Sequence, residues 1–269
     1  MFSGFLGFLY AADKWTDGKS RSHAVTEKIM PTGGTMEKLL IKGGKMLNVA
    51  ISGEMENQFE RYREMLLSWN EKMNLTAISE PDEVTVKHFL DSIAGQTYIP
   101  QDASVIDVGT GAGFPGLPLK IIRGDIRLTL LDSLNKRLVF LQETAKELRL
   151  QDIAFVHQRA EDAAHISLYR EQFDIAVSRA VAPLNVLLEY CMPFVKIGGC
   201  FLAYKGKEAE TEAKTAKAAL MKTGSKIECV APVVLPDTSL EHKIIVIRKM
   251  TACDKNLPRK AGTPSKKPL

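Results

Sequence analysis

Short apolar, β-branched runs alternate with amphipathic segments between residues 104 and 205, and this alternation limits the possible folds more than any other feature. The runs predict strands, and segments of helical spacing lie between most of them. Strands that alternate with helices form a parallel sheet covered on both faces. The runs are SVIDV (104–108), IRLTLLD (126–132), IAFVH (153–157), FDIAVS (173–178) and CFLAY (200–204), the last one after a turn at KIGG.

Two further apolar runs follow a charged helical segment that ends at Gly224. These runs, residues 227–235 and 241–249, are separated only by PDTSL, which leaves no room for a crossover helix. They should therefore pair as an antiparallel hairpin. The sequence predicts an α/β fold with a doubly wound, mostly parallel sheet of seven strands that ends in this hairpin.

The rest of the chain divides by composition. Residues 1–35 show no persistent hydrophobic period, and we expect a disordered extension outside the fold. Residues 36–100 are expected to form helices packed on the core. One helix should run from about Glu54 to Asn74, and in the next Ser79 should cap the helix while Pro81 opens its first turn. Residues 101–250 would form the sheet domain, and residues 251–269 a basic tail.

Positive charge is concentrated at the carboxyl-terminal end. The formal net charge is +4, but residues 248–269 contain seven basic residues and one acidic residue, so the other 247 residues sum to −2. A concentration of this kind predicts a polyanionic partner. A disordered end that only improves solubility is the alternative.

Several classes of protein are excluded by motifs that the sequence lacks. No stretch approaches the ~20 apolar residues that cross a bilayer, so we expect no membrane-spanning segment. No basic region precedes the short apolar run at the start of the chain, so we expect no signal peptide. The four cysteines and five histidines form no group with metal-ligand spacing, so no metal is predicted. We expect a cytoplasmic protein with reduced cysteines.

A glycine-rich segment, VIDVGTGAGFPG (105–116), follows the first predicted strand, where a doubly wound sheet binds its ligand. Glycine allows a positive φ and lets a ligand approach the backbone. One interpretation is a dinucleotide site of an NAD-binding oxidoreductase, because Gly111, Gly113 and Gly116 satisfy GxGxxG and Asp132 follows nineteen residues after Gly113. A structural turn without a ligand is a further alternative.

The other interpretation is a site for S-adenosyl-L-methionine. Asp107 would precede a GxGxG loop at Gly109, Gly111 and Gly113, and Asp132 would accept hydrogen bonds from both ribose hydroxyls, because a carboxylate is only an acceptor. The terminal hairpin and the lack of visible partners for hydride transfer favour this interpretation.

Several motifs together resemble the glucose-inhibited division protein B family, bacterial guanine-N7 methyltransferases of small-subunit ribosomal RNA. The resemblance extends from about Glu54 to the last residue. The motifs are HFLDS (88–92), DVGTGAGFPGLPL (107–119), LLDSLNKRLVFL (130–141), RAE (159–161), SRAVAPL (178–184), GG with YKG (198–206) and PRKAGTPSKKPL (258–269).

The resemblance implies a class I methyltransferase domain over residues 101–250 with S-adenosyl-L-methionine as cofactor. Gly109 and Phe114 would line the cofactor, and the loop backbone around Gly111 would surround its methionine end. Asp132 would bind the ribose. Further along the chain, Ala160 and Glu161 would flank the adenine, and Arg179 would close the pocket. Without the motif, Glu161 would be interpreted as a solvated acid at a helix start.

The chemistry at guanine N7 needs no general base, because this nitrogen carries a lone pair and no proton at neutral pH. The segment after the fourth strand is SRAVAPL and lacks the Asn/Asp-Pro-Pro-Tyr/Phe motif of many exocyclic-amine methyltransferases. No catalytic residue is assigned. His88 and Asp91 are expected to hold the N-terminal helices to the sheet, and substrate contact is the alternative.

The partner implied by the resemblance is small-subunit ribosomal RNA or the 30S particle. We expect the protein itself to be a monomer. Basic side chains would contact RNA phosphates. They are Lys205 and Lys207 after the fifth strand and Arg259, Lys260, Lys266 and Lys267 in the tail. A small-molecule methyltransferase, which would not need the tail, and a non-enzymatic RNA-binding module remain alternatives.

Overall fold

The structure, a computed structural model, describes residues 35–179, 182–239 and 241–269, and the statements below refer to these residues. The predicted disorder of residues 1–35 falls almost entirely on residues 1–34, which lie outside the described part. Thr35 already begins helix α1 (Thr35–Met46).

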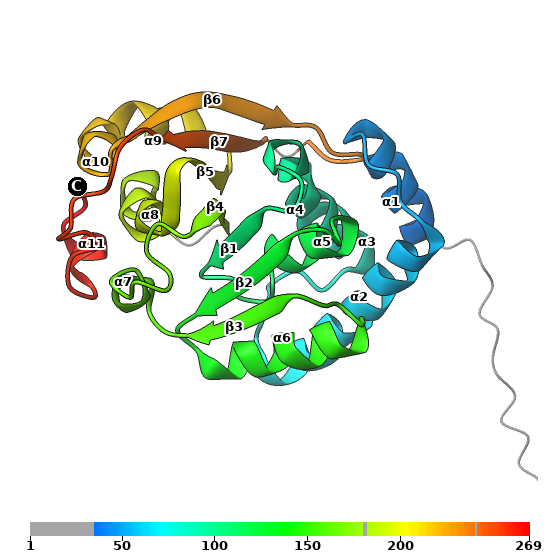
Figure 1. The fold of residues 1–269 in the computed structure, drawn as a ribbon. Coiled ribbons are helices and arrows are strands. Elements are labelled where there is room, and N and C mark those ends of the chain that lie inside the picture. The colour runs from blue at the N-terminus through cyan, green and yellow to red at the C-terminus, as the bar shows by residue number, and fades with distance from the viewer. Residues whose placement is uncertain (1–34, 180–181, 240) are drawn as a thin grey trace, which may run out of the picture. The chain divides into compact units, whose positions relative to one another are not determined.

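One sheet of seven strands has the order β3-β2-β1-β4-β5-β7-β6 (Figure 1). Strands β1 to β5 are parallel to their neighbours within that group, and β7 is antiparallel to both β5 and β6. The predicted fold, including its terminal hairpin, is confirmed. The strands are β1 (Ser104–Val108), β2 (Arg127–Asp132), β3 (Ile153–His157), β4 (Phe173–Arg179), β5 (Val195–Lys205), β6 (Ser225–Val233) and β7 (His242–Lys249).

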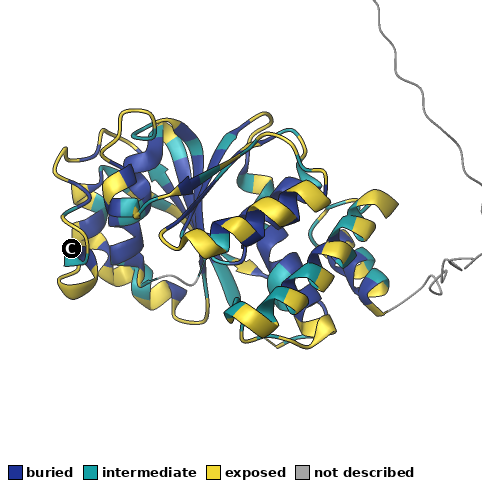
Figure 2. Ribbon diagram, turned by 90° about the horizontal axis from the view of Figure 1, so that it is seen from below, coloured by how far each residue is buried: buried dark blue, intermediate teal, exposed yellow. Residues whose placement is uncertain are grey.

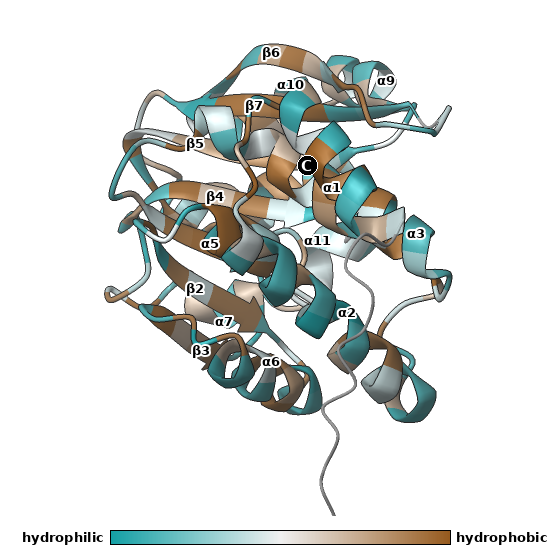
Figure 3. Ribbon diagram, turned by 90° about the vertical axis from the view of Figure 1, so that its right-hand side faces the viewer, coloured by the Kyte–Doolittle hydropathy of each residue, from teal (hydrophilic) through white to brown (hydrophobic). Residues whose placement is uncertain are grey.

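The strands alternate their side chains between two hydrophobic clusters, one on each face of the sheet. Val105 belongs to the cluster beneath the N-terminal helices with α5 (Gly116–Ile122) and α6 (Asn135–Glu147). Its neighbour Ile106 belongs to the cluster beneath α8 (Leu184–Cys191) and α10 (Lys217–Lys222). Buried residues gather along the sheet and the helix faces that cover it (Figure 2), and the strands carry much of the hydrophobic character (Figure 3).

The N-terminal helices lie where the sequence predicted them, but not every helix end is at the predicted residue. Helix α2 (Gly53–Met73) begins after Ser52, whose Oγ accepts a hydrogen bond from the Met55 N–H, and ends at Asn74 in the left-handed region. The next helical stretch comprises α3 (Pro81–Glu83), η1 (Val84–Leu90), α4 (Asp91–Ile93) and η2 (Ala94–Tyr98). The predicted cap at Ser79 is wrong, because Glu80 precedes Pro81 at that position and makes no side-chain cap.

Two other segments differ from the prediction. Strand β5 includes the predicted turn KIGG, because Val195 pairs with Phe173 of β4 and the strand continues through Gly198 and Gly199. The charged segment before Gly224 forms two helices, α9 (Ala209–Thr215) and α10, instead of one. Neither difference changes the order of the strands.

The basic carboxyl-terminal segment is folded against the domain. It contains the short helix α11 (Thr263–Lys266) and lies beside α8 and α7 (Ala160–Ala163) (Figure 1). Arg170 fixes the approach to this segment, since its guanidinium donates hydrogen bonds to the carbonyls of Asp254 and Leu257 at 3.0 and 2.7 Å. His165 Nε2 lies 2.8 Å from the carbonyl oxygen of Pro258. The short η3 (Met192–Phe194) follows α8.

Candidate functional site

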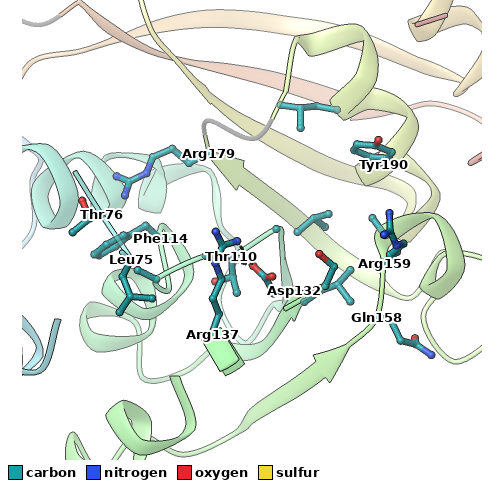
Figure 4. A pocket seen from close by; sticks show the side chains of 18 of the residues that line it. Leu75, Thr76, Thr110, Phe114, Asp132, Arg137, Gln158, Arg159, Arg179 and Tyr190 are labelled. Atoms are coloured by element: carbon teal, nitrogen blue, oxygen red, sulfur yellow. Dashed lines mark hydrogen bonds and ion pairs between the residues drawn. The ribbon is translucent and has the colours of Figure 1, made fainter. Parts of the chain in front are cut away.

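A cavity of about 560 Å³ opens at the carboxyl ends of β1, β2 and β4, the switch point of the sheet. Its size falls within the range of roughly 300–1,000 Å³ that small-molecule sites occupy. Figure 4 shows Asp132 and Thr110 near its middle, Phe114 and Arg179 on one side, and Tyr190 on the other. All seven residues that were predicted to bind the cofactor line this cavity: Gly109, Gly111, Phe114, Asp132, Ala160, Glu161 and Arg179.

Glycine is needed at different positions of the loop after β1 for different structural reasons. Gly109, Gly111 and Gly113 all have positive φ, at 73, 60 and 97°. A Cβ on Gly111 would meet nothing within 4 Å, whereas a Cβ on Gly113 would lie 2.5 Å from the Tyr62 hydroxyl. Gly111 therefore leaves its space open beside the cavity, and Gly113 allows the loop to pack on α2.

A buried carboxylate, Asp107, supports the loop from the end of β1. Its Oδ2 accepts hydrogen bonds from the Thr110 hydroxyl at 2.7 Å and from the Gly116 N–H at 2.9 Å. Burial raises the pKa of Asp107 to about 7, against these hydrogen bonds, which lower it. Its Oδ1 has no hydrogen-bond partner among the described residues. Asp107 thus fixes both ends of the turn that carries Gly111 and Phe114.

The acid at the end of β2, Asp132, is held in one orientation by backbone donors. Its Oδ2 accepts from the Gly111 N–H and its Oδ1 from the Leu134 N–H, both at 2.9 Å. Arg137 adds an ion pair at 3.3 Å. Gly111 and Arg137 both donate to Oδ2, whereas Oδ1 accepts only from Leu134 and keeps a second lone pair, so Asp132 can still accept from a hydroxyl of a diol in the cavity.

Aromatic and cationic groups form the opposite wall. The His88 ring stacks on Phe114 with 4.5 Å between centroids, and the Arg179 guanidinium carbon lies 4.8 Å from the same centroid. Arg179 Nη1 donates to Asp91 Oδ2 at 2.9 Å. Burial, followed by the charge of Arg179, lowers the pKa of His88 to about 3, so this ring is neutral at pH 7.

A second cavity of about 860 Å³ adjoins the first and shares His88 and Arg179 with it. His242 from β7 lines it and places Nδ1 2.7 Å from Asp91 Oδ1. This hydrogen bond is the main reason why the pKa of His242 is raised. Asp91 therefore joins Arg179 and His242, and both His88 and Asp91 line a cavity in addition to packing the helices.

The far end of the first cavity is made by α7 and α8. Glu161 is only 8% exposed, so its interpretation as a solvated acid is wrong. Its Oε1 accepts a hydrogen bond from the Gly262 N–H at 3.1 Å. Tyr190 lies beside it and was not predicted. Burial raises the pKa of Tyr190, the hydrogen bond with Ser265 lowers it, and the charges of Glu161 and Glu189 raise it.

The predicted RNA-binding residues fall into two groups. The side chains of Lys207, Lys260, Lys266 and Lys267 are exposed. Lys205 is 7% exposed in its side chain, and its Nζ lies 2.7 Å from both the Ala182 carbonyl and Glu212. Arg259 forms an ion pair with the fully buried Glu189. Only the first group is free to meet phosphates without breaking a contact.

Within the described ranges, none of the helices combines the length and apolar character that crossing a bilayer requires. The same residues contain no group of three or more His, Cys, Asp or Glu side chains placed to hold a metal ion.

The strand order and the site together define an S-adenosyl-L-methionine-dependent methyltransferase: Asp107 is the next-to-last residue of β1, Asp132 ends β2, and the glycine loop lies between the two strands. A family model described as rRNA small subunit methyltransferase G matches residues 55–240. The chain belongs to this family, which confirms the resemblance seen in its motifs.

Relatives support the same membership over nearly their whole length. Ribosomal RNA small subunit methyltransferase G of Alkaliphilus metalliredigens is 48% identical over 86% of this chain and 98% of the relative. The protein of that name from Acetivibrio thermocellus is 48% identical over 87% and 97%, respectively. Among solved structures, a SAM dependent methyltransferase from Aquifex aeolicus is 16% identical over 67% of this chain and 97% of its own, with a TM-score of 0.49.

Proposed function

We propose that this chain transfers the methyl group of S-adenosyl-L-methionine to N7 of a guanine in 16S ribosomal RNA, with the cofactor held in the 560 Å³ cavity. The main observation behind the proposal is that seven residues, predicted from separate sequence motifs to bind the cofactor, line one cavity. Family membership supports this substrate over a small molecule. The same membership disfavours an NAD-binding oxidoreductase.

The donor groups in the cavity fit the proposed cofactor. Asp132 would accept from the ribose hydroxyls, and the open space at Gly111 would admit the methionine end to the backbone. Ala160 and Glu161 would flank the adenine, while Phe114 and Arg179 would close the end toward the second cavity. When bound, the cofactor supplies a sulfonium methyl group for an in-line displacement.

The guanine would enter the second cavity, because it adjoins the first and shares His88 and Arg179 with it. An N7 acceptor needs no proton removed, so the chain has to align the base and exclude other geometries. A neutral His88 suits this position, because a cation there would repel the positive charge of a sulfonium. Asp91 offsets the charge of Arg179 at the same wall.

Binding of RNA would use the exposed lysines, Lys207, Lys260, Lys266 and Lys267. Phosphate contacts of this kind give affinity but little choice of sequence. Lys205 and Arg259 are also proposed to serve RNA binding, though each holds a carboxylate within the fold. We further propose that the protein works as a cytoplasmic monomer on 16S RNA or the 30S particle.

The test is transfer of radiolabelled methyl groups from S-adenosyl-L-methionine to naked ribosomal RNA, isolated small subunits and intact ribosomes. The labelled RNA is digested to nucleosides, and N7-methylguanosine is the expected product. Absence of label from every RNA fraction would contradict the proposal, and label on another nucleoside would contradict the N7 assignment. Binding of RNA without any heat of cofactor binding would point to a non-enzymatic module.

A further inference from the structure

The carboxyl-terminal segment of residues 259–267 touches two residues that line the cofactor cavity. The Gly262 N–H donates to Glu161 Oε1 at 3.1 Å, and the Ser265 hydroxyl lies 2.9 Å from the Tyr190 hydroxyl. Both partners line the end of the cavity formed by α7 and α8. The segment thus lies behind this wall, on the side away from the sheet (Figure 1).

A buried ion pair fixes the start of this segment. The Arg259 N–H and Nε donate to Glu189 Oε1 at 2.7 and 2.8 Å, and Nη2 donates to Oε2 at 2.7 Å. Glu189 is fully buried and directly precedes Tyr190 on α8. A two-pronged pair of this kind sets orientation as well as distance. The segment therefore has a defined register against α8.

Of the two helices that form this wall, α7 has little local support. Helix α7 has four residues, which is too short for a stable helix on its own. Glu161 lies in its first turn, and Gly262 gives its carboxylate a backbone donor from about a hundred residues away. Tyr190 receives its contact from Ser265 in the same short segment. Both side chains therefore hydrogen-bond to the same stretch of chain.

We propose that residues 259–267 are positioning residues of the cofactor site, which hold Glu161 and Tyr190 where the adenine of S-adenosyl-L-methionine binds. This inference rests on the proposed function. It gives the basic segment a role in cofactor recognition that is separate from any contact of its lysines with RNA. The role depends on the Gly262 N–H and the Ser265 hydroxyl, which carry no charge.

The experiment measures the dissociation constant of S-adenosylhomocysteine by calorimetry, without RNA. A chain that stops after Arg259 keeps the Glu189 pair but loses both contacts, and we expect its dissociation constant to rise about tenfold or more. Ser265→Ala removes one contact and should raise it about threefold. Lys255→Gln, which changes an exposed lysine outside the segment, is the control and should leave it unchanged.

Kinetics separate positioning from general damage. In Ser265→Ala, the KM for S-adenosyl-L-methionine should rise while the KM for RNA and the melting temperature stay within error, and Ser265→Thr should restore the cofactor KM. A Ser265→Ala protein with wild-type affinity for S-adenosylhomocysteine would overturn the inference, even if the shortened chain failed to fold. Failure of the wild-type protein to bind would instead contradict the proposed function.

Discussion

The guanidinium of Arg179 lies over the ring of Phe114, 4.8 Å from its centroid, while its Nη1 is bonded to Asp91 at 2.9 Å. The Arg179 side chain therefore connects the glycine loop that follows β1 to the helical stretch that precedes β1. Lysine could keep the charge but could not make the planar contact and the forked hydrogen bonds together. Together with His88, Arg179 lines both cavities.

Arg179→Lys should reduce methyl transfer far more than it reduces stability. Because the positive charge near Asp91 is kept, we expect an unfolding free energy within about 1–2 kcal/mol of the wild type, whereas Arg179→Ala should lose about 3 kcal/mol by leaving a buried carboxylate less compensated. Urea unfolding and kcat/KM for 16S RNA provide the measurements. Equal activity of the lysine variant and the wild type would contradict a role at the site.

Asp132→Ala should weaken binding of S-adenosylhomocysteine by about 1.5–3 kcal/mol, since a charge-assisted acceptor for the ribose is lost. Part of this loss will come from the Gly111 N–H, which also loses its partner. Isothermal titration calorimetry gives the affinity. Asp162→Ala, an exposed acid on α7, is the matched control, and a similar loss there would argue against a specific contact at Asp132.

Two substitutions in the same loop should differ in their main effect, one on stability and the other on cofactor binding. Gly113→Ala places a methyl group 2.5 Å from the Tyr62 hydroxyl at φ 97°, so it should destabilise the fold by about 2–4 kcal/mol. Gly111→Ala has open space around the methyl group and should cost only about 1 kcal/mol. Its main effect should be weaker cofactor binding. Urea unfolding and calorimetry on both variants provide the comparison, and a Gly111→Ala protein with unchanged affinity would contradict the placement.

The low pKa of His88 predicts a loss of stability in acid. Below about pH 6.5 the unfolded chain takes up a proton at this residue, whereas the folded chain does so only near pH 3, so acid favours unfolding. Between these values the contribution changes by up to about 1.4 kcal/mol for each pH unit.

Urea unfolding between pH 4 and 7 gives the slope of the unfolding free energy against pH for the wild type and for His88→Gln. The difference between the two slopes measures the contribution of His88. Asp107, whose raised pKa acts in the opposite sense over this range, contributes equally to both proteins and so cancels. His157→Gln, at an exposed histidine, should keep the wild-type slope. Parallel curves for the wild type and His88→Gln would show that His88 is not buried in its neutral form.

Replacement of Lys260, Lys266 and Lys267 by glutamine should lower the dependence of RNA affinity on salt. Each phosphate contact contributes about 0.7–0.9 to the slope of log K against log salt, so the slope should fall by about 2. Filter binding between 50 and 300 mM KCl gives the slope. The control changes the exposed Lys38, Lys45 and Lys72 on α1 and α2, and an equal fall there would indicate a non-specific charge effect.

Local patterns predicted much of the fold. The limits of β1 and β3 agree with the sequence to the residue, because short apolar runs bounded by turns specify such strands closely. Strand β5 was predicted too short because its first part pairs with Phe173 despite two glycines, which is a tertiary effect. The π-helical turns at Val84–Leu90 have no local signal either.

The site was predictable where a motif is continuous in sequence and hidden where it depends on distant contacts. The loop residues and Asp132 follow from one strand–loop–strand unit. His242 meets Asp91 across 151 positions, and Tyr190 meets Ser265 across 75, so no local pattern could join them. Lys205 and Arg259 were recognised as basic residues, but their carboxylate partners could not be seen from composition.

The cavity draws its walls from both hydrophobic clusters that the sheet separates: Phe114 belongs to one cluster, and Leu131 and Leu187 belong to the other. A ligand that touches both has to be released before either layer can open. Amide hydrogens on the two sides of the sheet should therefore become protected together when the ligand binds, so that the two layers exchange as one cooperative unit.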